Sequence, residues 1–156
     1  MADFFAEYRS IIIFLHVISA VIWVGGMITM RYAVHYSLIE LEPPLRLERT
    51  AHALKNLFKI VVPFVAILLV TALIMAIAMG LHHGDLKVTA FTKEAIWSIM
   101  SLNLFMMILR RNKAQKLIDR GEYALAKPLL GLIGSVMVPV NIALGIIAIF
   151  LGVTLS

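Results

Sequence analysis

The sequence predicts an all-α integral membrane protein, folded as one bundle of four transmembrane helices with both termini outside. Of the 156 residues, 62% are hydrophobic and only 15% are charged, a composition too apolar for a soluble domain of this size. Four apolar stretches each have the roughly 20 residues that a helix needs to cross a hydrocarbon core of about 30 Å. The predicted spans are 10–30, 60–80, 91–109 and 132–153, within a single domain covering residues 1–156.

The cationic side chains predict the orientation of these spans. Most of the 14 Lys and Arg residues lie between spans one and two or between spans three and four. By the positive-inside rule these two connections face the cytoplasm. The termini and residues 81–90 then face outward from a bacterial inner membrane. The net charge of +5 is therefore explained by topology, and the predicted partner is the lipid bilayer, with no nucleic acid.

Proline and glycine predict where the helices break. Pro43-Pro44 cannot continue the first helix, so we expect a second helix to begin near Leu45 and to extend beyond the bilayer. A turn is expected at Arg120-Gly121, after a similar extension of the third helix. Pro63 lies inside the second helix and is expected to bend it, and Pro128 is expected to start or kink the helix after the turn. Pro139 lies inside the fourth span, where neighbouring helices can satisfy the freed carbonyl.

His16 is the ionisable residue placed well inside an apolar run, and a function is the default explanation of such a residue. Helical spacing puts four side chains near its face: Ser19, Trp23, Met27 and Met30. Gly25-Gly26 would let another helix or a flat ligand approach. One interpretation is that His16 forms an interhelical hydrogen bond. The other is that it is an axial ligand of haem or a ligand of copper.

Lys93 is the second informative residue, because it begins the third span on the side from which His16 enters. A lysine there either extends to the interface or joins His16, together with His82 and His83, in a cluster of nitrogen donors. The chain has no cysteine, so any metal must use His, Met, Lys or carboxylate ligands.

The remaining polar residues have simpler expected roles. His35 and His52 are expected in exposed loops on the cytoplasmic side. Asn103 and Asn141 are expected to pair between spans three and four. The methionines fit either packing or soft copper ligation. No hydrolase, nucleotide-binding or zinc-protease motif occurs, so enzymatic activity would be redox chemistry on a bound cofactor.

The segment FLHVISAVIWVGGMITMRYAVHY resembles the first-helix signature of the HemJ and CopD groups of four-helix membrane proteins. The matching residues are His16, Trp23, Gly26 and Arg31, with His35 following. In these groups a lysine opens the third helix, and FTKEAIW places Lys93 there.

The resemblance implies a b-type haem held by His16, with Lys93 as second axial ligand or as partner of a carboxylate. It implies cofactor contacts from Trp23, Gly26 and Trp97, and catalytic roles for Lys93 and Arg31. The implied activity is that of an oxidoreductase similar to the HemJ-type protoporphyrinogen IX oxidase, passing electrons to quinone or another respiratory-chain acceptor.

Two alternatives stay open. The CopD resemblance implies copper or haem transport or binding without redox turnover. A structural subunit of a larger membrane complex is a further alternative, and a homo-oligomer is compatible with the sequence. The sequence also does not decide the sixth haem ligand, which would be Lys93, His82 or His83, or would be absent.

Overall fold

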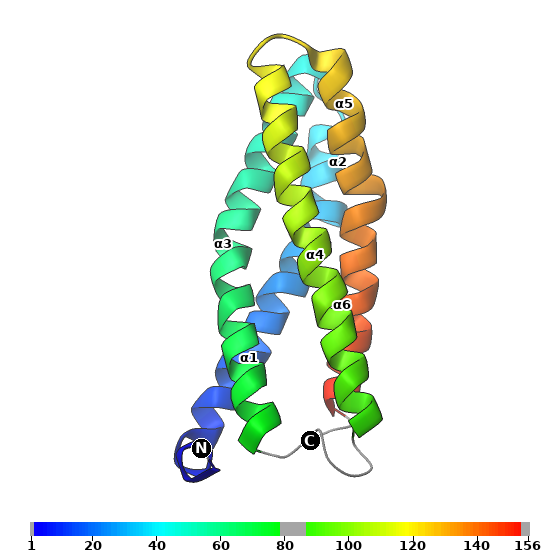
Figure 1. The fold of residues 1–156 in the computed structure, drawn as a ribbon. Helices are drawn as coiled ribbons and strands as arrows, with labels where there is room; N and C mark the ends of the chain where they lie inside the picture. Colours follow the sequence, from blue (N-terminus) through cyan, green and yellow to red (C-terminus); the bar gives the residue numbers. More distant parts are fainter. Residues whose placement is uncertain (1, 79–86, 154–156) are drawn as a thin grey trace.

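The computed structural model describes residues 2–78 and 87–153, which form an elongated bundle of four helical rods (Figure 1). The described residues contain no strand. The elements in chain order are α1 (Ala2–Thr29), η1 (Met30–Val34), α2 (His35–Leu38), α3 (Pro43–Ala78), α4 (Lys87–Ile118), α5 (Tyr123–Leu132), η2 (Ile133–Met137) and α6 (Val138–Val153). The last two residues of the predicted second span, and the predicted loop up to residue 86, lie outside the described residues.

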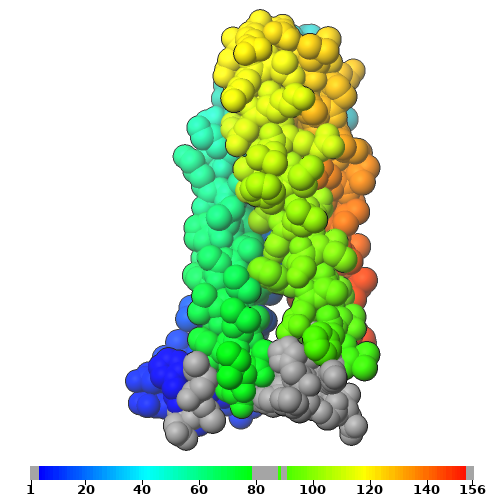
Figure 2. Space-filling view, viewed as in Figure 1, coloured from blue at the N-terminus to red at the C-terminus, as the bar shows by residue number. Residues whose placement is uncertain are grey.

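The two ends of the bundle differ in what they carry. Helix α1 begins and α6 ends at one end, called the terminal end below (Figure 1). The opposite end, called the turn end, carries the turns after α2 and α4. Helices α3 and α4 lie side by side toward the turn end and diverge toward the terminal end (Figure 2).

Both predicted breaks are confirmed. The first rod ends at Leu38, and Pro43 begins α3, where the missing N–H of proline is harmless because the first turn has no intrahelical acceptor for it. The first helical hydrogen bond of α3 runs from Arg46 N–H to the Glu42 carbonyl, at 2.8 Å. At the second break Gly121 has φ of +75°, a left-handed conformation that glycine adopts without strain.

The internal prolines lie inside helices, as predicted for Pro63 and Pro139. Pro128 does not start a helix, because α5 already begins at Tyr123. Pro139 lies two residues after the end of η2, a turn of π-helix. Proline lacks the N–H that would bond to the carbonyl four residues earlier and its ring crowds that carbonyl, so a widened turn just before it relieves the contact.

Three of the four rods are long and apolar enough to cross a membrane: Phe4–Leu38, Pro43–Ala78 and Tyr123–Val153. Only 17–28% of the most apolar 18-residue window of each is buried inside the bundle. Large side chains such as Phe14 and Phe150 therefore point outward, at 63% and 68% exposure. A contiguous apolar surface of this extent belongs in lipid, so the protein is an all-α membrane protein.

Helix α4 is the exception among the described helices. It contains the predicted span 91–109 but is not among the three apolar rods, because Lys93, Glu94 and Asn103 interrupt its apolar run. It nevertheless packs along α3, α5 and α6. The core that these rods enclose includes the fully buried side chains of Trp23, Met27, Val61, Met107 and Val138.

Candidate functional site

His16 is half-buried on α1, and its Nδ1 lies 3.0 Å from the Oγ1 of Thr71 on α3. Thr71 is only 4% exposed. Its hydroxyl also lies 2.8 Å from the Ile67 carbonyl and 3.0 Å from the Leu68 carbonyl of its own helix. The interhelical hydrogen bond anticipated for His16 is therefore present, and its partner is a threonine that the sequence reasoning missed.

This network assigns the imidazole tautomer. A threonine hydroxyl has one proton, and here two backbone carbonyls are in position to accept it. Thr71 then accepts from His16, which places the ring proton on Nδ1 and leaves the lone pair on Nε2. Metal-binding histidines are held in the same way, with the second ring nitrogen donating to an oxygen. The hydrogen bond thus leaves Nε2 able to bind a metal.

The residues that share the His16 face are tightly packed. Ser19 is fully buried, and its hydroxyl donates to the Leu15 carbonyl of its own helix at 2.6 Å. Trp23 is 1% exposed and Met27 is fully buried. Met27 and Met30 belong to the hydrophobic core cluster, a position that favours packing over copper ligation.

Lys93 lies on α4 at the same end of the bundle as His16. Its charge interacts electrostatically with His16. Its Nζ lies 3.5 Å from the position that a Cβ on Gly152 of α6 would take. The structure therefore brings His16 and Lys93 to one end of the bundle from two different rods. His82 and His83 lie outside the described residues.

Two buried indole nitrogens are left without a hydrogen-bond partner among the described residues: Nε1 of Trp23 and Nε1 of Trp97. An indole N–H deprived of water and of an acceptor is unfavourable by about 1–3 kcal/mol. Trp97 lies one turn beyond Lys93 on α4 and packs against the core. Both tryptophans therefore keep a buried N–H without a partner among the described residues.

Gly26 and Arg31 lie away from the His16–Thr71 pair, toward the turn end. A Cβ on Gly26 would lie 2.9 Å from Cδ1 of Leu57 on α3, so this glycine permits the close approach of α1 and α3. The sequence allowed either another helix or a flat ligand beside Gly26, and the structure places helix α3 there. Arg31 lies in η1, where it lines a separate cavity.

Asn103 and Asn141 form the predicted interhelical pair. Asn103 Nδ2 donates to Asn141 Oδ1 at 2.8 Å and also lies 2.8 Å from the Met137 carbonyl of η2. Asn141 Nδ2 donates to the Met100 carbonyl at 3.4 Å. The pair fixes α4 against the fourth rod.

Arg111 joins α4 to α3 near the turn end. The sequence interpretation counted it among the loop cations, whereas it is 8% exposed. Its Nε donates to the Ala51 carbonyl at 2.8 Å, and its terminal nitrogens reach Asn112 and Gln115. Burial lowers the pKa of Arg111 from its ordinary value, an effect that the charge of Asp119 opposes. A guanidinium stays charged through such a shift.

The expectation that His35 and His52 lie in exposed loops is wrong about the loops, and it is right about exposure for His52 alone. His52 is exposed, but on α3 and not in a loop. His35 begins α2 and is half-buried, because α1 continues as helix through η1. Among the residues at 2–78 and 87–153, no group of three or more His, Asp or Glu side chains is placed to hold a metal ion.

The fold and the polar groups within it define a class, that of an all-helical membrane protein with a histidine held between two apolar helices. Comparison with family models, with curated proteins and with solved structures found no match for this chain. The resemblance to the HemJ and CopD groups therefore stays a prediction from the residues named above.

Proposed function

We propose that the protein binds haem b in the membrane, with Nε2 of His16 as an axial ligand, and acts as an oxidoreductase or electron carrier. The observation that carries this proposal is the 3.0 Å hydrogen bond from His16 Nδ1 to Thr71, which leaves Nε2 with its lone pair. Imidazole is a common axial ligand of haem iron. In a chain without cysteine, His16 is the donor best prepared for that role.

The other residues at the terminal end fit the same group. Lys93 supplies a cation on α4, suited to binding a propionate, an anionic substrate or the iron itself. The unpaired N–H groups of Trp23 and Trp97 are buried donors that a bound molecule can use. Bound haem would supply one-electron redox chemistry. If the HemJ resemblance extends to activity, the substrate is protoporphyrinogen IX and the acceptor is a quinone.

The proposal includes four spans in a bacterial inner membrane, with the terminal end outside. Its support is that α4 packs along α3 and the fourth rod. The cations of the turn end also agree with a cytoplasmic location.

The test is the visible spectrum of the detergent-purified protein, oxidised and reduced, with haem content from the pyridine haemochrome. The expected result is a Soret band that His16→Ala abolishes and that the exposed control His52→Ala retains. Lys93→Met should shift the Soret band if Lys93 ligates iron, and should leave its position unchanged if Lys93 binds a carboxylate.

Two outcomes would contradict haem binding through His16. One is a colourless protein after expression with added haem precursor, and the other is a full Soret band in His16→Ala. A colourless protein that retains copper would instead support the CopD-like alternative. Thermal unfolding of each variant separates loss of cofactor from loss of fold.

A further inference from the structure

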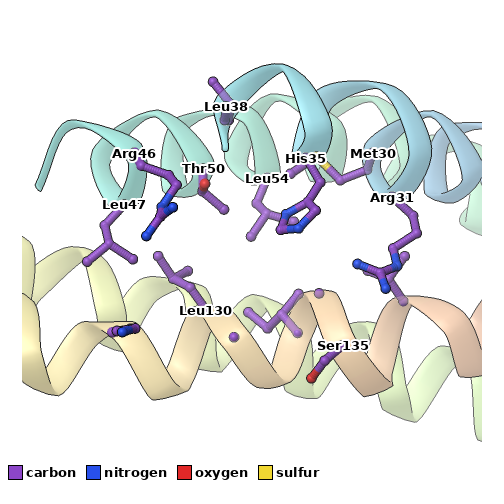
Figure 3. A pocket seen from close by; sticks show the side chains of 15 residues that line it. Met30, Arg31, His35, Leu38, Arg46, Leu47, Thr50, Leu54, Leu130 and Ser135 are labelled. Carbon is purple, nitrogen blue, oxygen red and sulfur yellow. The ribbon is translucent and has the colours of Figure 1, made fainter. Parts of the chain in front are cut away.

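A second polar region lies far from His16, in a cavity of about 310 Å³ toward the turn end (Figure 3). The first rod, the start of α3 and the α5–η2 segment enclose it. Its apolar lining includes Met30, Leu54, Leu130, Ile133 and Val138. All five of these side chains are core residues with 7% exposure or less, so the apolar part of the lining is well packed.

The polar part of the lining is basic. Arg31, Arg46 and Lys127 come from three different helical segments, and His35 lies beside them. None of the fifteen described lining residues is acidic. In Figure 3 the guanidinium groups of Arg31 and Arg46 and the imidazole of His35 project into the space between the helices. Arg46 reaches the Ile39 carbonyl at 3.3 Å, and within the described ranges no ion pair neutralises these cations.

Both π-helical turns border this cavity. Turn η1 contributes Met30 and Arg31, and η2 contributes Ile133, Gly134 and Ser135. Single π-helical turns inside α-helices are frequent at functional sites, because the extra residue redirects the side chains around it. The η2 turn has a local cause in Pro139, but nothing in the local sequence explains η1.

The position along the spans indicates what such a cavity can bind. Arg31 directly follows the predicted first span, and Lys127 precedes the predicted fourth span by five residues. Arg31 and Lys127 therefore lie at the height of the lipid headgroups, and the apolar lining continues toward the hydrocarbon. Basic pockets between transmembrane helices on the cytoplasmic side bind anionic headgroups.

We propose that this cavity is a binding site for the phosphate headgroup of an anionic phospholipid, with the start of an acyl chain against the apolar lining. Arg31, Arg46 and Lys127 bind the phosphate oxygens, and the Leu54–Leu130 side contacts the chain. The site is independent of His16 and does not rest on the proposed haem chemistry.

The test is native mass spectrometry of the detergent-purified protein titrated with phosphatidylglycerol or with zwitterionic phosphatidylcholine of the same chains. We expect retention of phosphatidylglycerol and not of phosphatidylcholine. In Arg31→Gln/Lys127→Gln the affinity should fall about 30-fold, because each cation near an anionic lipid contributes about 1 kcal/mol. The matched control Lys113→Gln/Lys116→Gln removes two exposed cations outside the cavity and should change affinity less than twofold.

A second variant tests the cavity without removing charge. Gly134 lines the cavity, and a Cβ built on it meets no atom within 4 Å, so Gly134→Leu fills space without a clash at the backbone. It should reduce phosphatidylglycerol binding while thermal stability is kept. Inorganic phosphate at millimolar concentration should not displace the lipid. Displacement would show that the site takes free phosphate and would overturn the lipid assignment.

Equal losses in the cavity pair and the control pair would mean that surface charge alone holds the lipid, and would overturn the site. Unchanged binding in Gly134→Leu would do the same. If Arg31→Gln/Lys127→Gln does not fold, Arg46→Gln replaces it in the test. This single variant should also lower the affinity for phosphatidylglycerol, by a smaller factor than the double variant.

Discussion

Asn103 of α4 and Asn141 of α6 join their side chains in a hydrogen bond of 2.8 Å between neighbouring rods, and Asn141 is fully buried. Asn103 also reaches the carbonyl of Met137, the last residue of η2. One side chain of the least apolar rod therefore secures both the α6 helix and the irregular turn before it.

Replacing Asn103 by leucine should destabilise the bundle by about 1–2 kcal/mol, because it removes the hydrogen bonds to Asn141 Oδ1 and to the Met137 carbonyl in an apolar interior. Asn103→Leu/Asn141→Leu should cost less than the sum of the two single changes. Equilibrium unfolding in mixed micelles measures the cycle. Ser98→Ala, at an exposed site where the hydroxyl binds only its own helix, is the neutral control. Additive single changes would contradict a direct coupling.

Thr71→Val should retain haem but weaken its binding about 10–100-fold, because the hydrogen bond that orients His16 is lost while Nε2 stays. Thr71→Ser keeps a hydroxyl and should restore wild-type affinity. Haem titration of apoprotein measures both. This prediction rests on the proposed cofactor. Equal affinities for valine and threonine would remove the positioning role of Thr71.

Two adjacent glycines offer a matched test of the α1–α3 contact. Gly26→Ala should be less stable than Gly25→Ala by about 1 kcal/mol, because its Cβ would lie 2.9 Å from Cδ1 of half-buried Leu57, whose side chain must shift. Gly25→Ala meets nothing within 4 Å and should be neutral or stabilising by about 0.5–1 kcal/mol. Thermal unfolding in detergent compares them. The same response in both variants would be incompatible with this packing.

Arg111→Leu should loosen the turn end, because it removes the donor to the Ala51 carbonyl and leaves the amide of Gln115 with one partner fewer. Hydrogen exchange should rise in the first turns of α3 and stay unchanged around His16. Lys113→Gln, an exposed cation change on the same helix, is the control. Equal exchange in both variants would argue against an interhelical role for Arg111.

The topology of α4 can be tested directly because the chain has no cysteine. Val88→Cys and Lys113→Cys lie on either side of the predicted span 91–109. In spheroplasts of a bacterial host, an impermeant thiol reagent should label position 88 and not position 113. Labelling of both positions from one side would exclude a fourth span, and the reverse pattern would invert the orientation.

Composition and proline spacing were sufficient to predict the helical rods, the break before Pro43 and the turn at Gly121, since these depend on local chemistry. The asparagine pair was also predictable, because two amides in apolar runs have few other partners. Thr71 was missed, although a hydroxyl within ILLVTALIMAIA is itself a signal. Which hydroxyl meets His16 depends on the rotation of α3 about its axis, which one sequence does not determine.

The cationic residues also show that one sequence does not determine how individual side chains pack. Counting the cations predicts which end of the bundle is cytoplasmic. The count treats every cation alike, so it does not distinguish a buried cation from an exposed one. Only packing separates Arg111, turned between two helices, from exposed Lys113. Likewise the cavity depends on η1, whose extra residue has no sequence marker comparable to Pro139.

The turns η1 and η2 also set the rotation, about the helix axis, of one half of the first and fourth rods relative to the other half. Each turn takes up one residue more than a regular helix, a residue that would otherwise rotate the segments on either side by about 100°. Deleting a single residue from Met30–Val34 would convert this widened turn into regular α-helix, so that His16 would still face Thr71 and His35 would keep its side of the rod. A π-helical turn can therefore gain or lose one residue without disturbing the packing of the helical segments on either side. The terminal end and the turn end can change their side chains independently of each other.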